Sequence, residues 1–174
     1  MSSPMPSQMP SQALPRSALI AVAAGMVAGT TNLVAAAAIF GGTPMQGFQM
    51  IASGLLGEAA FSGDLNAAAL GAVLHFAISI AAAALYLWAA LRHRALTGHW
   101  LVGGVVFGVL AYLVMNLIVV PLSHAANPDF SLSMVVKELL AHTVLFGVPI
   151  AGIVRAFARN EQDSEPATQR AWEK

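Results

Sequence analysis

Five polar residues that could bind a proton, a metal ion or a small polar molecule lie inside long hydrophobic stretches of this 174-residue chain. They are Asn32, His75, Asn116, Glu138 and His142. Glu138 and His142 are four positions apart, so a helix would place them on one face. The same spacing joins Tyr112 to Asn116. Polar side chains within membrane-spanning helices are costly and tend to mark functional sites. These six residues are the candidate polar cluster.

Three kinds of chemistry fit the polar cluster. Histidine titrates near neutral pH and a nearby carboxylate moves that value, so Glu138, His142 and His75 suit a proton-responsive site. Two histidines at similar depth on different helices suit axial ligation of a haem b, or a metal ion held by His75 and His142. The cluster also suits a pocket for a quinone, a lipid or a small solute. A purely structural interpretation competes with these: hydrogen bonds between helices, worth ~0.6–2 kcal/mol each.

Four apolar stretches must position this cluster. Each reaches the ~20 residues that a helix needs to cross a bilayer. They cover about residues 17–40, 69–91, 100–121 and 134–155. Only 9% of the residues are charged, against about a quarter in soluble domains. No stretch alternates apolar and polar residues as a transmembrane β-strand does. The sequence therefore predicts an all-α integral membrane four-helix bundle.

The predicted membrane domain covers 17–157 and lies between two polar tails. Residues 1–16 are rich in Pro, Ser, Gln and Met, a composition typical of disorder. Residues 158–174 are polar and charged. The first apolar stretch is longer than the about 7–15 apolar residues of a signal peptide, so we expect it to remain as a span.

An additional amphipathic helix is predicted between the first two spans, over about residues 44–61. Thr43 suits an N-cap, with Pro44 at the first helical position. Apolar residues follow at spacings of three and four, and polar residues such as Gln49 and Ser53 fall largely on another face. This pattern is typical of a helix that lies on the outer membrane surface or covers the end of the bundle.

Small residues and one proline bear on how the spans pack. Three pairs of small residues lie four positions apart: Gly25 and Gly29, Gly104 and Gly108, and Gly147 and Ala151. Such pairs allow helix backbones to approach closely in lipid, so we expect them at contacts inside the bundle. Pro149 removes the N–H that would bond the carbonyl of Leu145 in a regular helix. We expect a neighbouring group to satisfy that carbonyl.

The distribution of basic residues predicts the orientation. Seven of the eight flank one side of the predicted bundle: Arg16, Arg92, Arg94, Arg155, Arg159, Arg170 and Lys174. Lys137 alone lies on the other side. Because basic residues concentrate on the cytoplasmic side, both termini should face the cytoplasm of a bacterial inner membrane. Zero net charge without a basic stripe argues against nucleic-acid binding. The absence of cysteine excludes thiolate metal sites and disulfides.

Short motifs across residues 47–155 resemble a group of uncharacterised four-span bacterial inner-membrane proteins of the YagU-like type. The resemblance rests on IASGLLGEAAFSGD (51–64), LHFAISIAAAALY (74–86), YLVMNLIVVPLS (112–123) and KELLAHTVLFGVPIA (137–151). These stretches contain His75, Asn116, Pro121 and His142. What the resemblance implies is a four-span membrane protein loosely associated with acid resistance. It carries over no catalytic or binding residue.

No nucleophile elbow, phosphate-binding loop or zinc-protease helix occurs in the chain, so no enzymatic activity is predicted. The favoured hypothesis is a non-enzymatic membrane role in proton, pH or envelope homeostasis. The first alternative is an accessory subunit of a larger respiratory or photosynthetic membrane complex. The second is bis-histidine binding of haem or a metal. The expected partners are the lipid bilayer and either further copies of this chain or other membrane subunits.

Overall fold

The structure, a computed structural model, describes residues 16–63, 65–126 and 130–164, and all regular elements in these ranges are helical. Four helices are long and apolar enough to cross a membrane. They cover Arg16–Ile39, Leu65–Arg92, Trp100–Val119 and Leu132–Ala158. The predicted all-α bundle of four candidate spans is thereby confirmed. The predictions for residues 1–15 and 165–174 lie outside the described residues.

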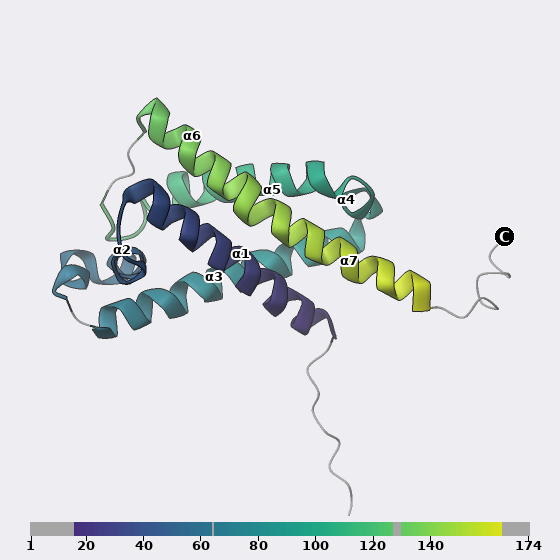
Figure 1. Ribbon diagram of the computed structural model, residues 1–174, viewed down its shortest axis with the longest axis horizontal. Helices are drawn as coiled ribbons and strands as arrows, with labels where there is room; N and C mark the ends of the chain where they lie inside the picture. The colour runs from purple at the N-terminus through teal and green to yellow at the C-terminus, as the bar shows by residue number, and fades with distance from the viewer. Residues whose placement is uncertain (1–15, 64, 127–129, 165–174) are drawn as a thin grey trace, which may run out of the picture.

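Most elements follow one another after at most a few residues, and a longer link over 120–131 joins η2 to α6. In chain order they are α1 (Arg16–Phe40), α2 (Pro44–Leu56), the 3-10 helix η1 (Gly57–Phe61), α3 (Leu65–Arg92), α4 (Arg94–Gly98), α5 (Trp100–Val114), the π-helix η2 (Met115–Val119), α6 (Leu132–Leu140), the π-helix η3 (Ala141–Gly147) and α7 (Val148–Ser164). α6, η3 and α7 form one continuous helix (Figure 1). The start of α1, α4 and the end of α7 lie toward one end of the bundle, and α2 lies at the other.

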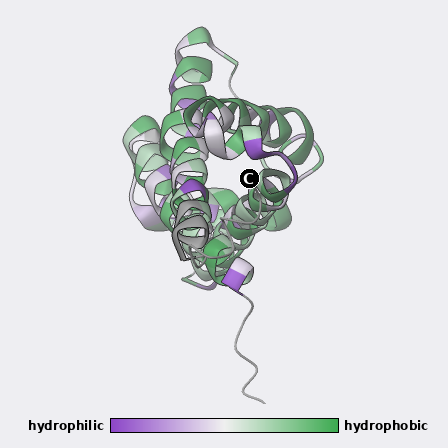
Figure 2. Cartoon of the chain, turned by 90° about the vertical axis from the view of Figure 1, so that its right-hand side faces the viewer, coloured by the Kyte–Doolittle hydropathy of each residue, from purple (hydrophilic) through white to green (hydrophobic). Residues whose placement is uncertain are grey.

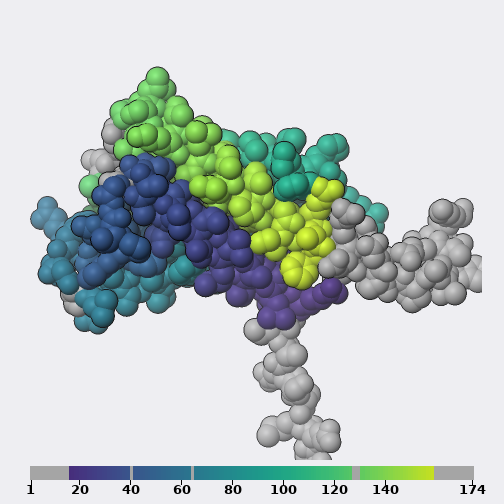
Figure 3. Space-filling model, in the orientation of Figure 1, coloured from purple at the N-terminus to yellow at the C-terminus, as the bar shows by residue number. Residues whose placement is uncertain are grey.

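The four long helices pack in the order α3, α1, α7, α5. α1 contacts α3 along one side and the η3–α7 helix along the other, and Figure 3 shows α1 beside that long helix over much of its length. α5 packs on η3 and α7. In the part of the chain that the structure describes, α3 and α5 share almost no backbone contact, although only α4 separates them in sequence. The bundle is therefore open between α3 and α5.

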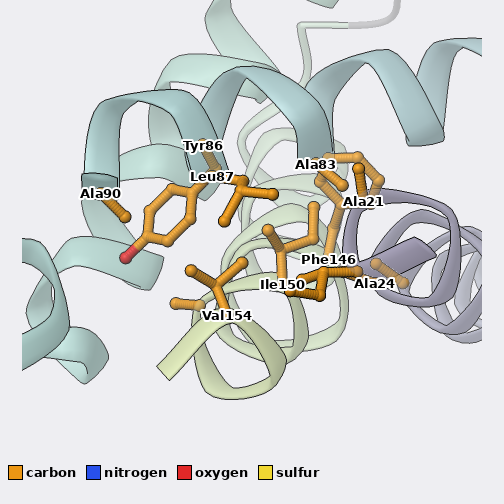
Figure 4. Close-up of a cluster of buried hydrophobic side chains, with 12 residues drawn as sticks. Ala21, Ala24, Ala83, Tyr86, Leu87, Ala90, Phe146, Ile150 and Val154 are labelled. Carbon is orange, nitrogen blue, oxygen red and sulfur yellow. The ribbon is translucent and has the colours of Figure 1, made fainter. Parts of the chain in front are cut away.

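A compact apolar core joins α1, α3 and α7 near the α4 end (Figure 4). Ile150 and Val154 of α7 are almost completely buried there, beside alanines of α1 and α3 such as Ala24 and Ala83. Many large apolar side chains elsewhere are exposed, and the helices are apolar around most of their surface (Figure 2). Helices that are apolar on all sides suit a lipid environment.

The predicted small-residue pairs lie at the helix contacts. A Cβ on Gly25 would lie 2.5 Å from the Cα of Ile80 in α3, and one on Gly29 would lie 2.9 Å from the Ser79 hydroxyl. A Cβ on Gly108 would overlap the His142 carbonyl, and one on Gly147 would overlap the Gly104 carbonyl. Because these glycines lack side chains, α1 can pack closely on α3, and α5 can pack closely on η3–α7. This confirms the prediction that the small-residue pairs lie at helix contacts inside the bundle.

α2 lies at the predicted position, but its buried face is not the apolar face that the sequence pattern predicted. Thr43 is its N-cap and forms a capping box with Gln46, and Gly41 with φ 67° ends α1. The buried residues of α2 are Gln49, Ala52 and Ser53, whereas Met45, Met50, Leu55 and Leu56 are exposed. Close contact with α3 explains this difference, because a Cβ on Gly71 would overlap the Phe48 carbonyl. Contact with α3 therefore decides which face of α2 is buried.

The close contact at Gly108 yields a prediction about stability. In Gly108→Ala the added methyl meets backbone atoms of His142 and Thr143, which cannot move aside like a flexible side chain. Overpacking of this kind costs about 1–3 kcal/mol. We expect a lower Tm for the purified protein in detergent. Gly98→Ala is the matched control, since a Cβ there meets nothing within 4 Å. Equal Tm values for the two variants would contradict the contact.

Candidate functional site

Two neighbouring cavities occupy the interior of the bundle. The first, the α3–α5 cavity, has a volume of about 570 Å³ and lies between the two helices that do not pack together. The second, the α2-side cavity, has about 460 Å³ and lies between the end of α1, the start of α2, η2 and the α6–η3 helix. Both volumes fall in the range of about 300–1,000 Å³ that is usual for small-molecule sites.

The polar cluster lies where these two cavities meet. Five residues line both of them: Asn32, Ile51, His75, Met115 and His142. Asn116 and Glu138 line the α2-side cavity only. Tyr112 is buried, and its ring meets that of His142 edge-on with centroids 5.7 Å apart. The structure thus brings all six candidate residues to one region, from α1, α3, α5, η2, α6 and η3.

His75 is fixed by a contact with the neighbouring helix. Its Nε2 lies 2.8 Å from the carbonyl oxygen of Gly29 in α1. A carbonyl only accepts, so this nitrogen carries the hydrogen, and in the neutral ring Nδ1 keeps a lone pair. The rings of Phe48 and Phe76 pack around the imidazole at 6.3 and 5.3 Å between centroids. α2 and α3 therefore both hold this side chain in place.

His142 is fixed by its own helix. Its Nδ1 lies 2.8 Å from the carbonyl oxygen of Glu138, one turn earlier. By the same reasoning Nδ1 is the donor, and in the neutral ring Nε2 keeps a lone pair. Tyr112 and Phe146 contact the ring. Each histidine thus has one nitrogen bonded to a backbone carbonyl and one available as an acceptor.

Two π-helical segments carry part of the cluster. Asn116 lies in η2 and bonds the Tyr112 carbonyl through Nδ2 at 3.2 Å, and His142 lies in η3. Each segment ends two residues before a proline, Pro121 or Pro149. A proline ring clashes with the carbonyl four residues earlier and cannot donate a hydrogen bond, so it loosens the preceding turn. π-segments are frequent at functional sites.

The carbonyl affected by Pro149 has the partner that the sequence analysis anticipated. The Thr31 hydroxyl of α1 lies within hydrogen-bond distance of the carbonyl oxygen of Leu145, as well as of the carbonyl oxygens of Val27 and Ala28 in its own helix. This contact joins α1 to the π-segment that holds His142. The expectation that a neighbouring group satisfies this carbonyl is therefore confirmed.

The α3–α5 cavity is a cleft with an open side. Ile78 and Leu85 of α3 and Val106, Leu110 and Val114 of α5 line it while remaining substantially exposed. Toward the α4 end the rings of Tyr86 and Phe107 meet with centroids 5.1 Å apart, and the lining continues past them to Ala89, Leu96 and Gly103. In a bilayer the open side would face the acyl chains. The two histidines lie at the other end of the cleft.

Several contributors to this site had no signal in the sequence. Ile51 and Met115 line both cavities, yet apolar residues in apolar stretches do not stand out. For α2 the sequence predicted a position on the membrane surface or over the end of the bundle, and not a wall of a cavity. Among the described residues no three His, Asp or Glu side chains lie close enough together to hold a metal ion.

Searches against protein-family models, curated proteins and solved structures find no match to this chain. The resemblance to YagU-like proteins therefore stays a prediction.

The Thr31 contact predicts a specific loss of stability. Thr31→Val keeps the shape of the side chain but leaves the Leu145 carbonyl without this donor, beside a proline that cannot replace it. We expect a loss of about 1–2 kcal/mol in unfolding experiments in detergent. Thr30→Val is the control, because the Thr30 hydroxyl bonds only Met26 of its own helix. A control variant that loses as much stability as Thr31→Val would refute the role of this contact.

Proposed function

We propose that this chain is a multi-pass protein of a bacterial inner membrane with a non-enzymatic role in pH or envelope homeostasis. In this proposal the polar cluster binds a small molecule or a proton within the bilayer. Both termini face the cytoplasm, and a relationship to YagU-like proteins forms part of the proposal. The supporting observation is that His75 and His142, from helices far apart in sequence, line the same two cavities.

A binding role fits this arrangement better than hydrogen bonding between helices alone. Only one of the two histidines bonds a different helix: His75 bonds Gly29 of α1, whereas His142 bonds the backbone of its own helix. Polar residues retained only to join helices are expected to bond across the contact. Each histidine instead lies at a cavity wall with one nitrogen available. Glu138 and Tyr112 add groups that can exchange or orient a proton.

The proposed orientation places the α2-side cavity toward the outside of the cell. Arg92 stacks over the Trp88 ring at 4.7 Å and Arg155 over the Trp100 ring at 5.4 Å. Arginine and tryptophan together are typical of a membrane–water boundary, and the basic residues favour the cytoplasmic one. A solute or proton would then reach the histidines from outside, past Thr43 and Gln46.

Cells provide a direct test of the histidines. A host strain lacking the gene would be complemented with the native chain, His75→Gln or His142→Gln, where glutamine stays polar but does not titrate. We expect both variants to slow the recovery of cytoplasmic pH after an external acid shift. His99→Gln, at an exposed residue of the α4–α5 connection, should behave like the native chain. Native recovery in both variants, with equal membrane levels, would overturn the proposal.

Single-cysteine labelling tests the orientation. The native chain has no cysteine, so each introduced thiol is unique. Ser62→Cys, between η1 and α3, and Ala95→Cys, in α4, place exposed thiols at opposite ends of the bundle. We expect a membrane-impermeant maleimide to label Ser62→Cys in intact spheroplasts and Ala95→Cys only after lysis. The reverse pattern would contradict cytoplasmic termini.

A further inference from the structure

The polar atoms at the end of the α3–α5 cavity that holds His75 and His142, the histidine end, restrict the kind of ligand that the cavity can bind. Outside the histidine end, its walls are almost wholly alanine, leucine, valine, isoleucine and phenylalanine side chains. The polar residues near the histidine end are Asn32, His75, Ser79 and His142. A molecule that fills this space must therefore have one polar end and one apolar end.

The hydrogen-bonding capacity of the polar end is mostly accepting. His75 uses Nε2–H on Gly29 and His142 uses Nδ1–H on Glu138, which leaves an acceptor nitrogen on each neutral ring. The Ser79 hydroxyl donates to the His75 carbonyl at 2.8 Å, so its oxygen also retains only accepting capacity. Asn32 alone can supply donors from its side chain. A ligand head with hydroxyl groups would complement this set, whereas a head with carbonyl oxygens alone would meet mainly other acceptors.

The apolar part of the cavity has the dimensions of a lipid tail. Its lining residues on α3 run from His75 to Ala89, fourteen residues, or about 21 Å at the rise of an α-helix. The Tyr86 and Phe107 rings meet near its far end, and the exposed rim residues of α3 and α5 leave its side open. A tail could therefore enter laterally, between helices that have almost no contact to separate.

We infer that the α3–α5 cavity binds a lipid-soluble molecule with a hydroxyl-bearing head, such as a quinol or a long-chain alcohol. The head lies between His75 and His142 and donates hydrogen bonds to them, and the apolar tail lies along α3 toward Tyr86. This inference rests on the proposed function and specifies the ligand of its site. Binding in the α2-side cavity is not required.

The test compares ligands that carry different head groups on the same decyl tail. The full-length protein in nanodiscs would be titrated anaerobically with decyl-benzoquinol, decyl-benzoquinone and decanol at about pH 8, where an ordinary imidazole is neutral. We expect the quinol to bind about tenfold more tightly than the quinone, the order expected for two hydrogen bonds gained. His142→Gln should reduce that preference, because an amide can donate as well as accept, and His99→Gln should not. If decanol binds as tightly as the quinol, the natural head is an aliphatic alcohol. If decanol binds more weakly than the quinol, the natural head is an aromatic diol.

Two further variants separate the ligand class from the site. Ala82→Phe fills the α3–α5 cavity, and Ala84→Phe adds the same ring to an exposed position on α3 that does not line it. We expect only Ala82→Phe to abolish binding. If the quinone binds as tightly as the quinol but Ala82→Phe still abolishes binding, the hydroxyl inference is wrong and the cavity stands as a binding site. If the native chain binds none of the three probes, or if neither phenylalanine variant weakens binding, both the inference and the proposed site fail.

Discussion

The close backbone contact of α5 with the η3–α7 helix is the constraint on which the rest of this structure depends. Gly104, Gly108 and Gly147 have no side chains to hold the two helices apart, and atoms of the facing helix, mostly backbone, occupy the space that a Cβ would need. In lipid, where apolar surface gains little from burial against other apolar surface, such contacts supply much of the packing energy. α5 packs on this helix and shares almost no backbone contact with α3 in the described part of the chain. The cleft lies between α3 and α5.

Proline acts on the same region in a complementary way. Glycines draw α5 toward η3, while Pro149 loosens the turn that contains His142 and frees a carbonyl for Thr31. Pro121 stands in the same relation to η2 and Asn116. Two of the six candidate residues, Asn116 and His142, thus lie on backbone that departs from the regular α-helix. Local irregularity of this kind is tolerated in membranes where neighbouring groups satisfy the backbone, as Thr31 does.

The sequence predicted the features that depend on local chemistry. Long apolar stretches located four spans to within a few residues, Thr43 and Pro44 located the start of α2, and the glycine pairs located helix contacts. The similar depth of His75 and His142 on different helices also indicated that these two residues would lie near one another. The missing features depend on which helix packs on which. No residue type in the sequence predicts that α3 and α5 lack backbone contact. The burial of Gln49 in place of Met50 likewise follows from the contact of α2 with α3.

The residues that form the cleft rim are distinct from those that join the helices. Ile78, Leu85, Val106, Leu110 and Val114 line the α3–α5 cavity and remain exposed, whereas the helix contacts rely on glycines and on the α1–α3–α7 core. Substitutions at the rim would alter the shape of the cleft without introducing a clash at a helix contact. The positions that hold the bundle together are thus largely separate from those that shape the cleft. Related chains could change the shape of the cleft while retaining the same bundle.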